Sequence, residues 1–124
     1  MIELEEAQRR ILAVLEEAGQ EPLVAMLNTI IEPTGSPEEI LVYKLGIEAL
    51  ADEGLITLKK SGQNIGDLVA TKPADLEFWR TLSDRVTFDG ADSYWRGPIG
   101  WAQQQPTIFV TDRGHAEAKR LLTV

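Results

Sequence analysis

Apolar residues recur at helical spacing in three segments of the first half of the chain. The first segment, residues 3–18, has its apolar positions three and four apart and ends before Gly19. The second covers residues 22–31, where Pro22 suits the first position of a helix. The third covers residues 37–53. We therefore expect three consecutive helices, joined by short turns.

The third of these segments has the clearest boundaries. Ser36, Pro37 and Glu39 have the types expected at the N-cap, N1 and N3 positions, which is the pattern of a capping box. At the other end, Gly54 is suited to the left-handed conformation that often ends a helix. The pattern predicts a capped helix that leads directly into the next element.

Two β-type runs are widely separated in the second half. Residues 55–58 follow the third helix, and residues 107–110 precede a final helix that Thr111 or Asp112 caps and that extends to Leu122. The 48 residues between the two runs, 59–106, are called the insert below. Within the insert, residues 68–71 suit a return strand and residues 74–85 a short helix, and 86–106 read as loop or short strands.

The order of these elements resembles the winged helix-turn-helix superfamily. Three pieces carry the resemblance: the turn Glu32-Pro33-Thr34-Gly35 between the second and third helices, the run Leu50-Ala51-Asp52-Glu53-Gly54-Leu55-Ile56, and the run Val110-Thr111-Asp112-Arg113-Gly114-His115-Ala116. The last run is similar to the strand-to-helix step of MarR- or PadR-type regulators. The resemblance implies an α+β fold, with a small antiparallel sheet, an enlarged wing region at 59–106 and residues 1–124 as a single domain. It also implies a class that often binds DNA.

The charge distribution changes that functional expectation. Residues 1–54 carry 12 acidic and 3 basic side chains, a net charge of −9, whereas residues 55–124 carry 8 acidic and 9 basic, a net charge of +1. Major-groove reading relies on Arg, Lys, Asn or Gln, and the third helix offers only Lys44. An acidic surface also repels phosphates. Nucleic acid is therefore disfavoured as a partner of this helix.

Four lysines are the positions that could contact DNA. Lys44 lies in the third helix, and Lys59, Lys60 and Lys72 flank the expected wing hairpin. A phosphate backbone could be held by such side chains. The alternative for the three wing residues is an ordinary hairpin in which lysine blunts an edge strand.

The insert holds six of the eight aromatic residues of the chain. Within it, Tyr94, Trp95, Arg96 and Trp101 have the side-chain types that dominate protein interfaces. Phe78, Trp79 and Phe88 are instead expected to fill a small core under the long connection. The two interpretations are a partner-binding or dimerising loop, favoured for Trp95 and Trp101, and a structural sub-core.

Several classes of chemistry have no support in the sequence. Cysteine is absent, His115 is the single histidine, and no acidic spacing matches an ion-binding loop. No nucleophile elbow or glycine-rich phosphate loop is present. We expect no enzyme, no cofactor and no metal. The acidic start of the chain and the lack of a long apolar run predict a cytoplasmic protein without a membrane contact.

Three functional hypotheses follow. The first is a protein-binding winged-helix module, with a protein partner or a second copy of the chain on its acidic helical face or aromatic insert. The second is a DNA-binding transcriptional regulator that contacts DNA through the wing. The third is an acidic inhibitor that imitates nucleic acid and occupies a basic protein.

Overall fold

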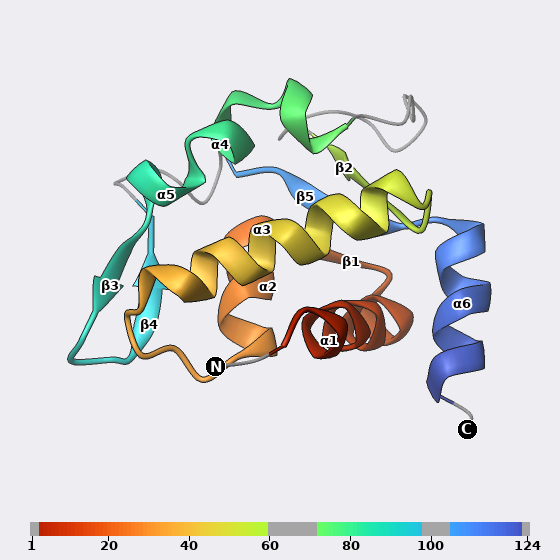
Figure 1. Cartoon of the computed structure of the whole chain (residues 1–124), viewed down its shortest axis with the longest axis horizontal. Coiled ribbons are helices and arrows are strands. Elements are labelled where there is room, and N and C mark those ends of the chain that lie inside the picture. The colour runs from red at the N-terminus through yellow and green to blue at the C-terminus, as the bar shows by residue number, and fades with distance from the viewer. Residues whose placement is uncertain (1–2, 60–71, 98–104, 123–124) are drawn as a thin grey trace.

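The structure, a computed structural model, describes residues 3–59, 72–97 and 105–122. It is an α+β arrangement of helices packed on a small antiparallel sheet, with a separate hairpin at one end (Figure 1). The main helices are α1 Leu4–Ala18, α2 Leu23–Ile30, α3 Pro37–Asp52 and α6 Asp112–Leu122. The expected helices are thus confirmed, with ends that differ by one residue or less from the predicted positions.

The sheet consists of β1 (Gln20–Pro22), β2 (Ile56–Lys59) and β5 (Thr107–Val110), in the order β1-β5-β2. All pairings are antiparallel. The two predicted strands, β2 and β5, pair directly. The sequence did not predict β1, because a three-residue strand without an apolar alternation gives no periodic signal.

The N-terminus of α3 is built largely as expected. Ser36 is the N-cap, and its Oγ accepts a hydrogen bond from the backbone N–H of Glu38. The Glu39 carboxylate accepts from the backbone N–H groups of Thr34 and Gly35, in the turn before the helix. Glu39 therefore fixes the α2–α3 turn rather than closing the capping box on the N–H of Ser36.

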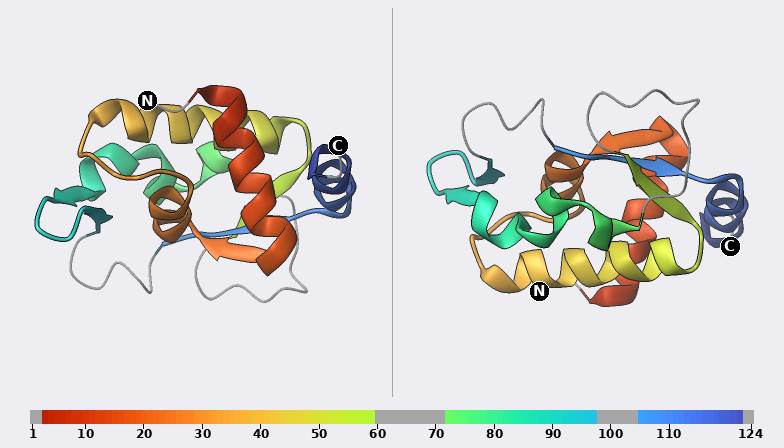
Figure 2. Two further views of the ribbon diagram at one scale, coloured as in Figure 1. Left: turned by 90° about the horizontal axis from the view of Figure 1, so that it is seen from below. Right: turned by 90° about the horizontal axis from the view of Figure 1, so that it is seen from above.

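The described part of the insert folds into short elements instead of the single helix expected at 74–85. These are η2 Pro73–Asp75, α4 Glu77–Arg80, α5 Leu82–Arg85, β3 Thr87–Asp89 and β4 Tyr94–Arg96. Thr81 separates α4 from α5 because its φ of −105° and ψ of 15° are not helical. The strand predicted at 68–71 lies outside the described residues. In Figure 2, α4 and α5 lie between α3 and the strands β2 and β5.

The junction between α3, β2 and α6 is held by Thr111. Its Oγ1 accepts from the N–H of Gly114, as an N-cap does, and donates to the carbonyl oxygen of Gly54 at 2.7 Å. Its backbone N–H donates to the carbonyl oxygen of Leu55. Thr111, rather than Asp112, is therefore the cap of α6.

Gly114 allows α6 to begin against the backbone of Leu55. A Cβ at this position would lie 2.0 Å from the Leu55 carbonyl oxygen. We expect Gly114→Ala to lower the free energy of unfolding by about 2 kcal/mol or more, because α6 must shift. Chemical denaturation measures this.

Gly90→Ala is the matched control, since no atom lies within 4 Å of the added Cβ. Equal stability of both variants would show that α6 does not approach the Leu55 backbone this closely.

Candidate functional site

Trp79 attaches the insert to one flank of α3. Its buried ring packs edge-on against Tyr43, with 6.5 Å between ring centroids. The indole Nε1 donates to Oε1 of Glu48 at 3.3 Å, and the Lys44 ammonium lies 5.4 Å from the ring centroid. The Trp79 ring therefore covers the side of α3 that carries Tyr43 and Lys44, and its Nε1 reaches the exposed Glu48 at the edge of that side.

The opposite flank of α3 packs against α1. An added Cβ at Gly46 would lie within 4 Å of Ile11, Ala7 and Gln8, all of α1. The helix is therefore bounded by α1 on one side and by Trp79 on the other. Only the strip between these two contacts is open.

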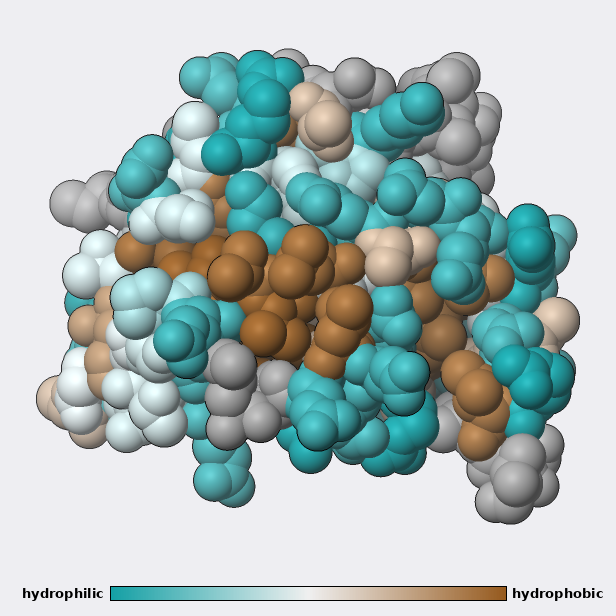
Figure 3. Space-filling view, in the orientation of Figure 1, coloured by the Kyte–Doolittle hydropathy of each residue, from teal (hydrophilic) through white to brown (hydrophobic). Residues whose placement is uncertain are grey.

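The open strip of α3 combines leucines with carboxylates. Its residues follow helical spacing, so that they form one face: Glu38, Leu41, Leu45, Glu48 and Asp52. We call this strip the α3 face. Leu41 is 57% exposed and Leu45 is 45% exposed, far more than the buried Ile40 and Ile47 of the same helix. Figure 3 shows apolar surface across the middle of this side of the molecule, over α3.

The expectations drawn from the sequence did not include this face. The sequence nevertheless carries a signal for it, in the phase of its leucines along the helix. Leu41 and Leu45 are four apart and in phase with Glu38 and Glu48, whereas the core positions Ile40, Tyr43 and Ile47 are out of phase with them. The phase of Leu41 thus places it on the polar side of the helix.

The lysines expected to contact DNA are not gathered on one surface. Lys44 is half-buried beside Trp79, and Lys72 is exposed on the insert. Lys59 is only 3% exposed, and its ammonium lies 5.8 Å from the centroid of the Phe109 ring. The prediction that Lys59 contacts phosphate is wrong, because the side chain is buried and not exposed to a partner. Lys60 lies outside the described residues.

The aromatic run of the insert is divided between core and surface. Trp95 is 5% exposed and packs edge-on against Phe88, with ring centroids 5.5 Å apart. The expectation that Trp95 contacts a partner is wrong, because its side chain belongs to the core. Trp101 lies outside the described residues. The sub-core expectation is confirmed for Phe78 and Trp79, which are buried, and Phe88 packs against the core.

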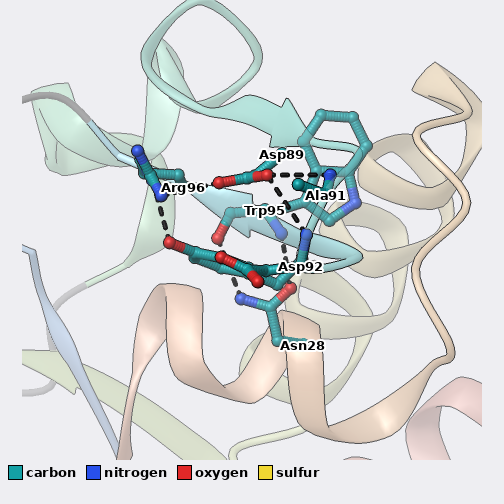
Figure 4. A network of polar contacts seen from close by, with 7 residues as sticks. Asn28, Asp89, Ala91, Asp92, Trp95 and Arg96 are labelled. Atoms are coloured by element: carbon teal, nitrogen blue, oxygen red, sulfur yellow. Dashed lines mark hydrogen bonds and ion pairs between the residues drawn. The ribbon is translucent and has the colours of Figure 1, made fainter.

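The backbone of Trp95 is fixed by the side chain of Asn28. The Asn28 Oδ1 accepts from the Trp95 N–H at 2.8 Å, and the Asn28 Nδ2 donates to the Trp95 carbonyl oxygen at 3.0 Å (Figure 4). The amide thus pairs with both backbone polar groups of one residue, as a residue of a neighbouring antiparallel strand would. This contact joins the β3–β4 hairpin to α2.

Tyr94 and Arg96 lie on the outer side of that hairpin. Arg96 is exposed, donates from Nε to the Tyr94 Oη at 2.9 Å, and pairs through Nη2 with Asp89 at 2.6 Å. The Tyr94 hydroxyl first, and then the Asp89 carboxylate, raise the pKa of Arg96 above its ordinary value. Asp89 also accepts from the N–H groups of Ala91 and Asp92, so it closes the turn between β3 and β4 (Figure 4).

In residues 3–59, 72–97 and 105–122, no group of three or more His, Asp or Glu side chains is placed to hold a metal ion. Within the same residues no helix has the length and apolar character needed to span a membrane.

His115, the single histidine of the chain, pairs through Nδ1 with Glu16 at 2.6 Å, which joins α6 to α1.

Comparisons with protein-family models, with curated proteins and with solved structures give no match. The α3 face therefore has to be interpreted from its own chemistry.

Replacing Asn28 with leucine tests how the hairpin is attached. The variant leaves the N–H and C=O of Trp95 without their partners, and each buried unpaired group costs about 1–3 kcal/mol. We expect a loss of about 2 kcal/mol or more in the free energy of unfolding, measured by denaturation monitored through tryptophan fluorescence.

Thr29→Ala is a suitable control, because Thr29 is the exposed neighbour on the same helix. The Asn28 contact is refuted when Asn28→Leu is as stable as this control.

Proposed function

We propose that this chain is a non-enzymatic winged-helix module that binds a protein through the α3 face. The observation that carries the proposal is the exposure of Leu41 and Leu45 in a strip flanked by Glu38, Glu48 and Asp52. Burying a leucine side chain contributes about 1.5–3 kcal/mol. The two leucines would supply the apolar centre of an interface, and the carboxylates its polar rim.

The element order supports the winged-helix part of the proposal. Helices α1, α2 and α3 precede β2, and β5 lies between β1 and β2 in one antiparallel sheet. The insert connects β2 with β5, which is the position of a wing. In this arrangement α3 corresponds to the helix that DNA-binding members place in the major groove.

The chemistry of α3 favours protein over DNA as the partner. The α3 face has no basic side chain, and the lone base of the helix, Lys44, is directed at the Trp79 ring. A surface that binds nucleic acid needs several Lys or Arg side chains. When they neutralise phosphates, the counterions of the nucleic acid are released, and this release supplies most of the binding affinity. Lys59 is buried. The adjacent leucines also distinguish this face from an imitation of nucleic acid, which would require carboxylates without an apolar centre.

A photo-crosslinking residue at position 41 identifies the partner in the cells that produce the protein. The purified partner is then titrated with the wild type and with the double variant Leu41→Gln/Leu45→Gln, which keeps helix-forming side chains. We expect the double variant to bind the partner at least about tenfold more weakly, because residues at the centre of an interface supply most of the binding energy. Folding of the variant is checked by circular dichroism.

Leu121→Gln is the matched control, because Leu121 is an exposed leucine on α6, away from the α3 face. The proposal fails if the partner binds the α3 variant and the wild type equally. It also fails if the wild type binds random-sequence DNA duplex at low salt with an affinity that falls as salt rises.

A further inference from the structure

A second apolar surface lies apart from the α3 face, between α1, the C-terminal end of α3 and α6. It is a groove of about 370 Å³, with leucine side chains from all of these elements in its wall. They are Leu12 of α1, Leu50 of α3, Leu55 just after α3, and Leu121 of α6. We call this surface the α6 groove. Figure 3 shows apolar surface on the α6 side of the molecule as well as over α3.

The groove exists because α6 is held mainly along one side. Helix α6 packs chiefly on α1, and its beginning is tied to the α3–β2 junction through Thr111. The last described turn carries Leu121, which is 37% exposed although its neighbours Leu12, Leu50 and Leu55 are almost fully buried. Covering the exposed part of Leu121 by another molecule would be favourable, because it removes apolar surface from water.

The rim of the α6 groove is acidic. Its charged residues are Glu5, Arg9, Glu53 and Glu117. Arg9 pairs with Glu6, and Glu117 pairs with Arg120, which lowers the pKa of the Glu117 carboxyl. Among the described residues, Glu5 and Glu53 take part in no ion pair. Arg113 also lies close by, since its charge contributes to lowering the pKa of Glu117, so the two carboxylates leave the rim with a small net negative charge.

We infer that the α6 groove binds a cationic amphipathic helix from another protein. Its described lining comes mainly from helices α1, α3 and α6 and includes no residue of a strand, so an inserted helix fits better than an added strand. Leu121, the exposed leucine of the wall, would contact the apolar side of that helix, and Glu5 and Glu53 would attract its Lys or Arg residues. A second copy of the chain is disfavoured, because two molecules of net charge −8 repel each other. The inference does not depend on the α3 face.

A labelled synthetic peptide of leucine and lysine at helical spacing is the probe, and fluorescence anisotropy measures its binding. We expect the wild-type protein to bind this peptide and not a leucine–glutamate peptide of the same pattern. Glu5→Lys/Glu53→Lys should weaken binding about tenfold or more, because it reverses the charge of the rim. Leu121→Gln should also weaken it, while Leu41→Gln/Leu45→Gln should leave it unchanged.

Glu17→Lys/Glu32→Lys is the matched control, since it makes the same change in net charge at exposed positions outside the groove. Equal weakening by both charge reversals would overturn the inference, because the peptide would then respond only to overall charge. Loss of binding in the α3-face variant alone would overturn it too. A wild-type dimer that Leu121→Gln dissociates, seen by sedimentation, would assign the groove to a second copy instead. The α3-face proposal stands or falls separately, on its crosslinked partner.

Discussion

The packing of Trp79 against α3 is the contact on which the surface of this protein depends. The indole ring contacts Tyr43, lies beside the Lys44 ammonium and donates to Glu48, so it covers one flank of the helix. A buried tryptophan supplies a large apolar contact area, and an aromatic pair of this geometry adds about 0.5–1.5 kcal/mol. With α1 on the other flank, α3 presents only its strip of leucines and carboxylates.

Tyr43 connects this contact to the rest of the core. Its hydroxyl donates to the carbonyl oxygen of Leu23 at the start of α2, while its ring meets Trp79. Burial, and to a lesser degree the charge of Glu21, raise the pKa of Tyr43 well above its ordinary value of 10.0. The phenol therefore keeps its proton at neutral pH and remains a donor. Together with the Asn28 amide on Trp95, it joins the insert to both α2 and α3.

The local parts of the fold could be predicted because their signals are local. Helical periodicity, the Ser36 cap and the β-type run at 107–110 depend on residues close in sequence. The strand that carries Trp95 is held by Asn28, which is 67 residues away, and the Lys59 ammonium lies near the ring of Phe109, which is 50 residues away in the paired strand β5. Such contacts leave no periodic trace. The candidate site shows the same division: the acidity of α3 could be read from the sequence, but its boundaries depend on the position of Trp79.

A nuclear Overhauser spectrum of the protein in solution tests most directly whether Trp79 packs against α3. Because the rings of Trp79 and Tyr43 are edge to face with centroids 6.5 Å apart, cross-peaks between their ring protons are expected. Protection of the Trp79 indole N–H from exchange with solvent should accompany them, since it donates to Glu48. Absent cross-peaks together with a rapidly exchanging indole N–H would mean that the insert does not cover α3, and the α3 face would lose its boundary.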